Sequence, residues 1–299
     1  MSWRLRVPAS SANLGPGFDA LGLALDLHLC CTFSRAEKLS ISAHGADSAE
    51  IPTDESNLIW QTALTVAKDA GAKLPPVTLE ICNEIPLGKG LGSSAAALTA
   101  GVVIGNQLLQ LNWSRHRILD EAAKIEGHPD NVAACVLGSV VASSIDSGGL
   151  THAVRLELPA NYEVAVVVPD FPLPTSRARS VLPESYSRAD VVFNVQRSAL
   201  LIAALCTGST ESFSAALEDR IHQPYRAPLI PGFEEMLKLR EPGLFGCALS
   251  GAGPSVLVFL ERGREDVTRL FEDIFRKHGH QAKTYFTEIQ RSGFQLAQL

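Results

Sequence analysis

The chain has 299 residues, of which 46% are hydrophobic and 19% are charged, and its formal net charge is −6. This length allows two packed lobes, and the composition is ordinary for a globular enzyme. The negative charge argues against a general nucleic-acid binder, which needs a basic surface, and the short apolar runs predict no membrane span. The N-terminus lacks the apolar segment of a signal peptide, so we expect a cytoplasmic protein. The six cysteines form no CxxC pair and are expected to be reduced thiols.

The first quarter of the chain predicts two strands and one helix. Residues 4–7 look like one strand and residues 23–29 with 32–34 like the next, residues 35–56 look polar and exposed, and residues 57–70 have helical spacing. Asp19 lies among apolar residues between the two strands, so its carboxylate must be paired or hydrogen-bonded. Two interpretations remain open: Asp19 caps a turn, or it faces the ammonium group of a ligand.

The most informative stretch is residues 84–96, which read Glu-Ile-Pro-Leu-Gly-Lys-Gly-Leu-Gly-Ser-Ser-Ala-Ala. A strand is predicted before it at residues 77–82 and a helix after it at residues 95–109, with Ser93 and Ser94 as the N-cap. Free N–H groups at the start of such a helix, together with its dipole, make an anion site. A buried strand–turn–helix with a glycine-rich bend is the alternative. We favour a phosphate cradle, because a simple turn needs only one or two glycines.

Known phosphate-loop patterns identify this loop only weakly. It lacks the Gly-Lys-Ser/Thr of a Walker loop. The dinucleotide pattern G-x-G-x-x-A matches residues 90–95 and also residues 15–20, and no acidic residue follows at the expected distance. A nucleotide-binding oxidoreductase therefore remains a weaker alternative.

A second polar loop follows a predicted helix at residues 114–126. Residues 126–133 read Glu-Gly-His-Pro-Asp-Asn-Val-Ala, and an apolar run continues behind them. A solvated polar turn would look similar, but the apolar support favours a site. Strands are predicted at residues 139–144 and 154–158, and a lobe boundary near residues 159–162.

The second half of the chain predicts another mixed lobe. A buried strand at residues 163–168 precedes a proline-rich loop at residues 169–183, whose arginines either bind an anion or are solvated. Residues 247–259 form a second glycine loop that leads into a strand, and either closes over a phosphate site or makes a tight hairpin. Further elements are predicted at residues 187–205, 212–217 and 267–278 (helices) and 282–287 (strand).

Four segments together resemble the GHMP kinase superfamily, and within it the homoserine kinase family. They are residues 11–22, 86–96, 126–133 and 249–255, and they lie in order along nearly the whole chain. The resemblance implies an α+β fold with two lobes: a ribosomal protein S5 domain 2-like, ATP-binding lobe over residues 1–160 and a ferredoxin-like lobe over residues 161–299. It also implies ATP-dependent phosphorylation of the side-chain hydroxyl of L-homoserine to O-phospho-L-homoserine, in threonine biosynthesis.

The resemblance also implies roles for individual residues. For Mg²⁺ it implies Ser94 and Glu126, with Glu121 on the same helix as the alternative. For ATP it implies Asn57 near the adenine and, around the phosphates, Pro86, Leu87, Gly88, Lys89, Gly90, Leu91, Gly92, Ser93, Ser94, Ala95, Ala96, Gly251 and Gly253. For the amino-acid substrate it implies Asn13, Asp19, His128, Asp130, Asn131, Thr175, Arg179 and Arg226.

Phosphoryl transfer needs positioning and charge neutralisation more than a covalent residue. We expect Lys89, the helix N-terminus and Mg²⁺ to neutralise the triphosphate. We expect Asp19 to hold the substrate ammonium, and Arg179 and Arg226 to hold its carboxylate. Many relatives have an aspartate base where this chain has Asn131, which cannot accept a proton at neutral pH. We therefore expect no dedicated general base, with Asn131 orienting the hydroxyl.

Alternatives to this interpretation remain. Another GHMP kinase would act on mevalonate-like alcohols or sugars, and a non-catalytic member would serve as a binding module. The expected partners are small molecules, and the sequence leaves a homodimer open.

Overall fold

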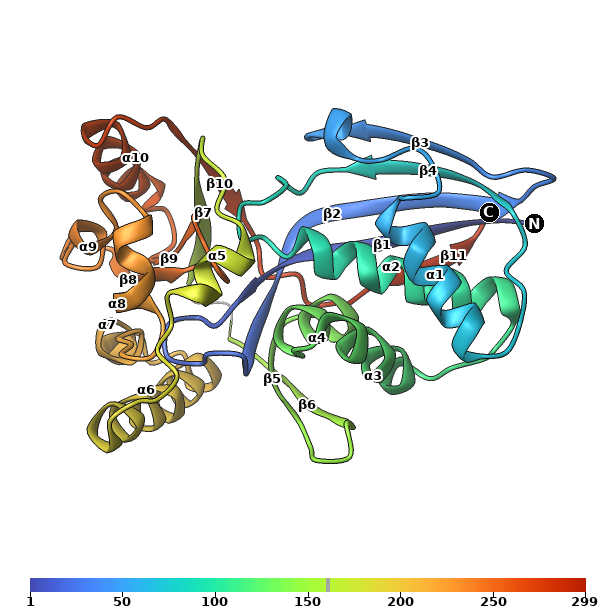
Figure 1. Cartoon of the computed structure of the whole chain (residues 1–299). Coiled ribbons are helices and arrows are strands. Elements are labelled where there is room, and N and C mark those ends of the chain that lie inside the picture. Colours follow the sequence, from blue (N-terminus) through green and yellow to red (C-terminus); the bar gives the residue numbers. More distant parts are fainter. Residues whose placement is uncertain (160–161) are drawn as a thin grey trace.

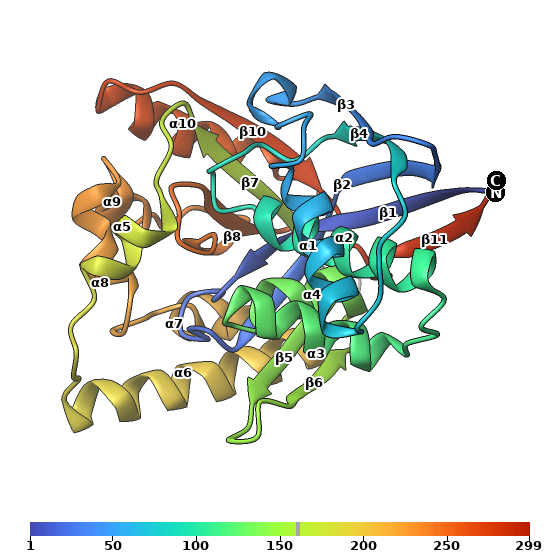
Figure 2. The same cartoon turned by 45° about the vertical axis from the view of Figure 1, so that its right-hand side comes forward.

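A computed structural model describes residues 1–159 and 162–299 of the chain. It has two lobes side by side, and both termini lie at the far end of the first lobe (Figures 1 and 2). The expected lobe boundary between residues 160 and 161 falls on the two residues outside the described ranges. Each lobe has its own sheet with helices packed on it, as expected for an α+β fold.

In the part of the chain that the structure describes, the first lobe contains a seven-stranded sheet with the main order β11-β1-β2-β4-β3, and β5 and β6 extend it from β2. All pairings are antiparallel except that of β3 with β4. A dinucleotide-binding fold needs a parallel sheet, so this topology argues against the oxidoreductase. The strands are β1 (Ser2–Ala12), β2 (Leu21–Arg35), β3 (Ser40–Gly45), β4 (Val77–Asn83), β5 (Val140–Ile145), β6 (Thr151–Leu156) and β11 (Gln295–Gln298).

Two strands of this sheet were not predicted. Residues 35–56 were expected to be exposed without a strand, but β3 lies there as an edge strand with only Ile41 buried. A polar edge strand gives little hydrophobic signal, because one face and one edge meet solvent. β11 pairs with β1 and therefore lies in the first sheet, although the expected division assigns residues 161–299 to the second lobe.

The described helices of the first lobe cover one face of its sheet (Figure 1). The central helix α2 approaches α1 closely, because a Cβ at Gly101 would lie 2.4 Å from Thr62 Cβ and one at Gly105 would lie 3.0 Å from Val66 Cβ. Small residues at these positions let α2 lie deep in the core, where most of its side chains are buried. The helices are α1 (Leu58–Asp69), α2 (Ser93–Leu109), α3 (Arg115–Glu126) and α4 (Asp130–Leu137), with a short 3₁₀ turn η1 (Ser48–Glu50) beside β3.

Over the described residues, the second lobe contains an antiparallel sheet with the order β10-β7-β9-β8. Side chains on alternate positions of β7 enter two different apolar clusters, Val164 and Val166 in one and Ala165 and Val167 in the other. Burial on both faces explains why this strand is continuously apolar. The strands are β7 (Glu163–Pro169), β8 (Leu244–Leu249), β9 (Val256–Leu260) and β10 (Ala282–Thr287). The helices are α5 (Thr175–Ser180), α6 (Arg188–Thr207), α7 (Phe213–Ala216), α8 (Gln223–Arg226), α9 (Phe233–Met236) and α10 (Thr268–Lys277), with the 3₁₀ turns η2 (Thr210–Ser212), η3 (Ala227–Leu229) and η4 (Glu265–Val267).

Three features of the second lobe bear on the sequence-based expectations, and the first of them is a correction. The proline-rich loop at residues 169–183 contains the short helix α5. The second glycine loop is the turn between β8 and β9, so it does form a hairpin. Among the described residues, helix α6 alone has the length and apolar composition of a membrane-spanning helix. Its most apolar 18-residue stretch has a mean hydropathy of 1.4, and 22% of that stretch is buried in the structure. Such a single helix is weak support for a membrane segment.

Candidate active site

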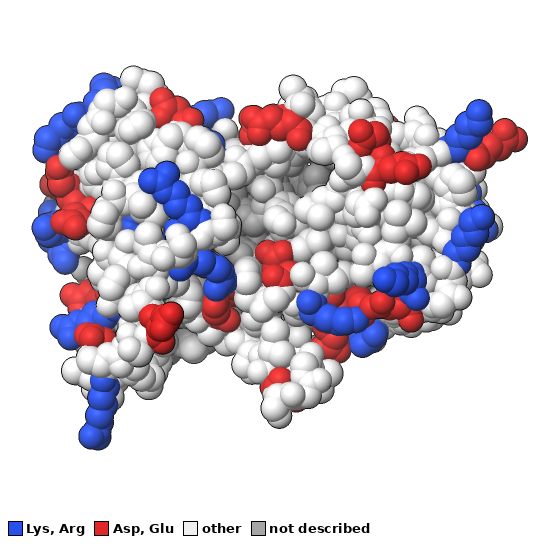
Figure 3. All heavy atoms as spheres, viewed as in Figure 1, with Lys and Arg blue, Asp and Glu red and all other residues white. Residues whose placement is uncertain are grey.

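The candidate site is a cavity of about 240 Å³ whose lining comes from both lobes. Figure 3, viewed as in Figure 1, shows the surface hollowed between the two lobes. All of the residues predicted to bind the substrate, and both preferred metal ligands, line the cavity. The lining residues are Ala12, Asn13, Asp19, Gly88, Gly90, Gly92, Ser93, Ser94, Ala95, Glu126, His128, Asp130, Asn131, Leu173, Pro174, Thr175, Arg179, Arg226, Gly251 and Ala252.

The glycine loop turns its carbonyl groups away from this cavity. Each carbonyl from residue 88 to residue 91 accepts a hydrogen bond from β1 or from the second lobe. The pairs are Leu173 N to Gly88 O (3.3 Å), Ser255 N to Lys89 O (3.3 Å), Ser250 Oγ to Gly90 O (2.8 Å) and Ser10 N to Leu91 O (3.0 Å). Within the described residues, no amide N–H from residue 88 to residue 95 donates to another protein group. The loop therefore presents a series of free donors beside the cavity, as an anion site does.

The helix behind this loop begins earlier than predicted. α2 starts at Ser93, and Gly92 is its N-cap with φ +67° and no side-chain capping bond. Ser93 and Ser94 therefore lie in the first turn rather than at the cap, and both residues line the cavity. Gly92 also fits tightly, because a Cβ there would lie 2.0 Å from Ser10 Oγ. Only glycine combines this dihedral angle with this contact.

Lys89 does not line the cavity, contrary to the expectation that it neutralises phosphate. Its ammonium group donates to the carbonyl of Pro169, 2.9 Å away, at the end of β7 in the other lobe. Partial burial lowers the pKa of Lys89. In this arrangement Lys89 links the lobes, and the backbone amides and the helix dipole of α2 supply the positive potential at the loop.

Several predicted nucleotide contacts are not among the described residues that line the cavity. Asn57 is buried and caps α1, with Oδ1 accepting from Ile59 N at 3.0 Å and Nδ2 donating to Pro52 O at 2.7 Å. Its amide is thus used to start the helix. The other predicted residues that do not line the cavity are Pro86, Leu87, Leu91, Ala96 and Gly253.

Asp19 of the first lobe and Arg179 of the second lobe form a bidentate ion pair. Arg179 Nη2 and Nη1 lie 2.9 and 3.2 Å from the two carboxylate oxygens. Asp19 has φ +53°, and its N–H donates to Asn13 Oδ1 at 3.0 Å, so the turn aims the carboxylate across the cavity. The two groups predicted to hold opposite ends of a zwitterion therefore pair with each other.

Arg226 is a buried cation at the back of the cavity. Its Nε donates to Ala178 O at 3.1 Å, and its Nη1 lies 3.2 Å from Gly251 O and 3.1 Å from His222 Nδ1. Since arginine only donates, His222 Nδ1 accepts, and the opposite nitrogen donates to Gly15 O at 2.7 Å. Burial, followed by repulsion from Arg179, lowers the pKa of Arg226 to about 10, so it stays charged at neutral pH.

The loop between α3 and α4 supplies a coupled set of titratable groups. His128 Nδ1 lies 2.9 Å from Asp130 Oδ1, and that oxygen also accepts from Asn131 N at 2.7 Å. The hydrogen bond to Asp130 raises the pKa of His128, although burial opposes it. Burial raises the pKa of Glu126, whose Oε1 lies 3.9 Å from His128 Nε2. The loop is therefore partly buried and internally hydrogen-bonded, unlike a fully solvated turn.

The two candidate metal carboxylates lie in different environments. Glu126 lines the cavity with Ser94, and hydroxyl and carboxylate oxygens are ligands that Mg²⁺ accepts. Glu121 instead contacts Arg117 at 3.0 Å and Lys124 at 3.5 Å and does not line the cavity. Asp19, His128 and Asp130 also bring ligand atoms within 4.8 Å of one another, but Arg179 already occupies the Asp19 carboxylate.

The sequence did not identify several residues that support the site. Ala12, Leu173, Pro174 and Ala252 line the cavity through small or apolar side chains, which carry no chemical signal. Supporting side chains behind it are Ser10, Phe18, His222 and Ser250. Most of these residues lie within or next to one of the four segments that resemble GHMP kinases. That position was the sequence signal by which they could have been found.

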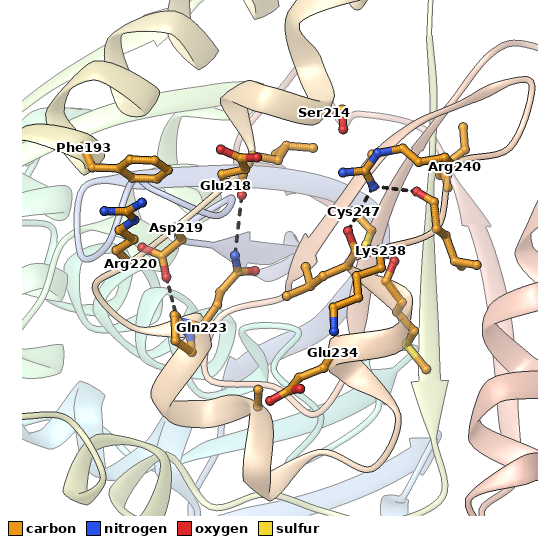
Figure 4. A pocket seen from close by; sticks show the side chains of 18 residues that line it. Phe193, Ser214, Glu218, Asp219, Arg220, Gln223, Glu234, Lys238, Arg240 and Cys247 are labelled. Atoms are coloured by element: carbon orange, nitrogen blue, oxygen red, sulfur yellow. Dashed lines mark hydrogen bonds between the residues drawn. The ribbon is translucent and has the colours of Figure 1, made fainter. Parts of the chain in front are cut away.

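A larger cavity of about 530 Å³ lies within the second lobe and is shown in Figure 4. No predicted site residue lines it, and many of its polar groups are used in structural contacts. Asp219 accepts from the backbone at the start of α8, and Arg240 donates to the carbonyls of Leu237 and Leu239. The smaller cavity between the lobes, which holds the free amides and the charged pair, is therefore the better candidate for chemistry.

Known proteins resemble this chain over nearly its whole length. The family models described as "GHMP kinases N terminal domain" and "GHMP kinases C terminal" match residues 57–139 and 201–280. Homoserine kinase from Solibacter usitatus is 65% identical over 99% of this chain and 97% of its own, and that from Deinococcus radiodurans is 46% identical over 97% and 95%. The crystal structure of homoserine kinase from Cytophaga hutchinsonii covers 99% of this chain and 97% of its own, at 28% identity and a TM-score of 0.86. These matches confirm the predicted two-lobed GHMP architecture, and the chain is an ATP-dependent kinase that belongs to the homoserine kinase family of the GHMP kinases.

Proposed function

We propose that this kinase transfers the γ-phosphoryl group of ATP to the side-chain hydroxyl of L-homoserine, giving O-phospho-L-homoserine for threonine biosynthesis. The observation that carries the proposal is the shared cavity. Gly88, Gly90 and residues 92–95, whose backbone amides are free, border it on one side, and carboxylate and guanidinium groups border it on the other. A triphosphate and a zwitterion need these two surfaces.

ATP would bind with its phosphates against the glycine loop and the N-terminus of α2. Because the carbonyl oxygens of residues 88–91 point away from the cavity, their partial negative charges do not face the proposed phosphates. The dipole of α2 adds positive potential at the same place. Mg²⁺ would be held by Ser94 and Glu126, and its chemical contribution is to neutralise charge on the phosphates. The cation contacts of Glu121 make it the weaker alternative as a ligand.

L-homoserine would bind at the Asp19–Arg179 pair. Its ammonium group would contact Asp19, and its carboxylate would contact Arg179 and the buried charge of Arg226. The bound substrate would then place its positive group beside the carboxylate of Asp19 and its negative group beside the two guanidinium groups. His128, Asp130 and Thr175 would complete the amino-acid pocket from the α3–α4 loop and α5.

No dedicated general base is needed in this proposal. Asn131 lines the cavity at the start of α4, and a carboxamide does not take up a proton at neutral pH. Asn131 would orient the hydroxyl, and the phosphoryl group would accept its proton as the new bond forms.

A substrate panel tests the proposal. We expect coupled ADP release to be fastest with L-homoserine among homoserine, mevalonate, galactose and shikimate, since mevalonate, galactose and shikimate lack an ammonium group. Preference for galactose or mevalonate would favour another GHMP activity, and no turnover together with no Mg-ATP binding in calorimetry would indicate a non-catalytic protein.

The Asp19→Asn variant tests the substrate assignment within the same assay. Loss of the charge should raise KM for homoserine by at least tenfold, because charge-assisted hydrogen bonds contribute about 1.5–3 kcal/mol. KM for ATP should change little, since the hydrogen bonds of Asp19 in the described structure join it to Asn13 and Arg179 rather than to the glycine loop. An unchanged KM for homoserine would contradict this assignment.

The proposed partners are these small molecules, in the cytoplasm. A homodimer is also proposed, for which the outer face of α6 is the candidate surface, because Val191, Val192 and Val195 are exposed there. Light scattering on the native protein and on Val195→Asp would decide it, and equal masses for both would remove α6 from consideration.

A further inference from the structure

Ser10 lies where the glycine loop meets the polar loop before α4. It is completely buried on β1, and its N–H donates to Leu91 O at 3.0 Å, which holds the glycine loop. Its hydroxyl donates to Asn131 Oδ1 at 2.9 Å. One residue thus contacts both the proposed phosphate side and the proposed hydroxyl side of the cavity.

The contact between Ser10 and Asn131 is tightly enclosed. A Cβ on Gly92 would lie 2.0 Å from Ser10 Oγ and 3.1 Å from Asn131 Oδ1, so Gly92 covers both atoms. Cys135 Sγ lies behind, 3.7 Å from Ser10 Oγ and 3.2 Å from Pro8 O. This close packing leaves the serine hydroxyl directed at the asparagine.

Fixing one end of a carboxamide fixes the other. When Oδ1 accepts from Ser10, the donor nitrogen Nδ2 is the end that remains for the cavity that Asn131 lines. Without the serine hydroxyl, the amide is free to turn over and present an acceptor instead. An N–H donor there would hold an oxygen of the reacting groups, whereas an acceptor would repel a phosphoryl oxygen.

We propose that Ser10 is a positioning residue that acts through Asn131, holding its amide so that Nδ2 faces the reacting oxygens. The inference rests on the proposed function, because it needs Asn131 beside the transferred group. Nothing in the sequence motif separates Ser10 from its neighbour. Ser11 is also completely buried on β1, but its hydroxyl contacts Ser250 at 2.9 Å rather than Asn131.

The test is a double-mutant cycle on kcat, measured at saturating ATP and homoserine. We expect Ser10→Ala to lower kcat by about tenfold, with KM for both substrates within about twofold, because loss of an orienting contact affects the transition state more than binding. We expect Ser11→Ala, the matched control, to keep kcat within about twofold. In an Asn131→Ala background, Ser10→Ala should cause no further loss of kcat.

Two other outcomes of the cycle would overturn the inference. A full further tenfold loss in the Asn131→Ala background would show a general structural role and overturn the inference, while leaving the proposed function intact. An unchanged kcat for Asn131→Ala would overturn both the inference and the proposed role of Asn131. If Ser10→Ala does not fold, Ser10→Cys keeps the side-chain volume with a weak donor, and the same loss and the same lack of additivity are expected.

Discussion

At the scale of single residues, the site depends on backbone positions that only a few side chains allow. Asn13 and Asp19 have positive φ, and an amide–backbone bond between them holds the Asp19 turn. Gly92 has the same kind of conformation and in addition lies against Ser10 and Asn131. Asn and Asp tolerate this region better than other residues with a side chain, and glycine is required where a neighbour fills the Cβ position.

Gly92→Ala should therefore damage the site beyond the ordinary cost of left-handed backbone. We expect kcat to fall by more than tenfold and the free energy of unfolding to fall by more than the roughly 1 kcal/mol that the conformation alone costs. Gly71→Ala is the matched control, since Gly71 has φ +63° and no atom within 4 Å of a Cβ. Equal losses in urea denaturation for both variants would show that the contact with Ser10 is unimportant.

His128 should make the stability of the site depend on pH. Its folded pKa is raised above 6.5, mainly by the hydrogen bond to Asp130. The stabilisation is therefore fully present below the unfolded pKa and is lost as pH rises through the folded pKa. The difference in free energy of unfolding between the native protein and His128→Gln should be larger at about pH 6 than at about pH 9.

An NMR titration of the His128 ring gives the direct measurement. The midpoint should lie above 6.5 in the native protein and should fall in Asp130→Asn, which removes the main cause of the shift. A native midpoint at or below 6.5 would contradict this reading of the loop.

At the scale of elements, the β8–β9 hairpin of the second lobe packs against the glycine loop and fixes its conformation. Ser250 Oγ donates to Gly90 O at 2.8 Å, and a Cβ on Gly90 would lie 2.3 Å from Ser250 O. The second glycine loop is thus a tight hairpin that packs against the first loop, and its closing over a phosphate site stays a prediction. The peptide groups of both loops are then oriented before any ligand binds.

Ser250→Ala should weaken ATP binding specifically. Loss of one hydrogen bond to the loop should raise KM for ATP by about fivefold, which corresponds to about 1 kcal/mol, while KM for homoserine changes less. Ser255→Ala is the matched control on the same hairpin, because Ser255 Oγ is buried without a partner among the described residues. Equal effects of the two variants on KM for ATP would argue that the hairpin contributes only packing.

At the scale of the whole molecule, the chain returns to its starting lobe. β11 pairs with Trp3–Arg6 of β1, and Phe294 packs beneath Arg115, whose guanidinium carbon lies 4.3 Å from the ring centroid. The last strand thus covers an edge of the first sheet, which would otherwise offer unpaired backbone groups. Lys89 makes a second link, from the glycine loop to the end of β7.

Removal of residues 295–299 should destabilise the first lobe although these residues lie outside the site. We expect a loss of about 2–4 kcal/mol in the free energy of unfolding, at about 1 kcal/mol for each lost strand contact, and a tendency to associate through the open edge. Removal of Leu299 alone, which donates one backbone bond to Ser2, should cost much less. An unchanged denaturation midpoint for the longer deletion would show that β11 adds nothing to stability.

The sequence by itself determined the family, the two-lobed architecture and the polar residues that line one cavity. It did so because glycine loops, a helix start and clustered polar side chains are local features that one stretch of chain carries. Tertiary structure decided what depends on distant partners: Lys89 contacts the other lobe instead of the cavity, Asn57 caps a helix, and Asp19 pairs with Arg179. It also decided that β3 and β11 are strands, since an edge strand is specified by the neighbour that it pairs with rather than by its own hydrophobicity.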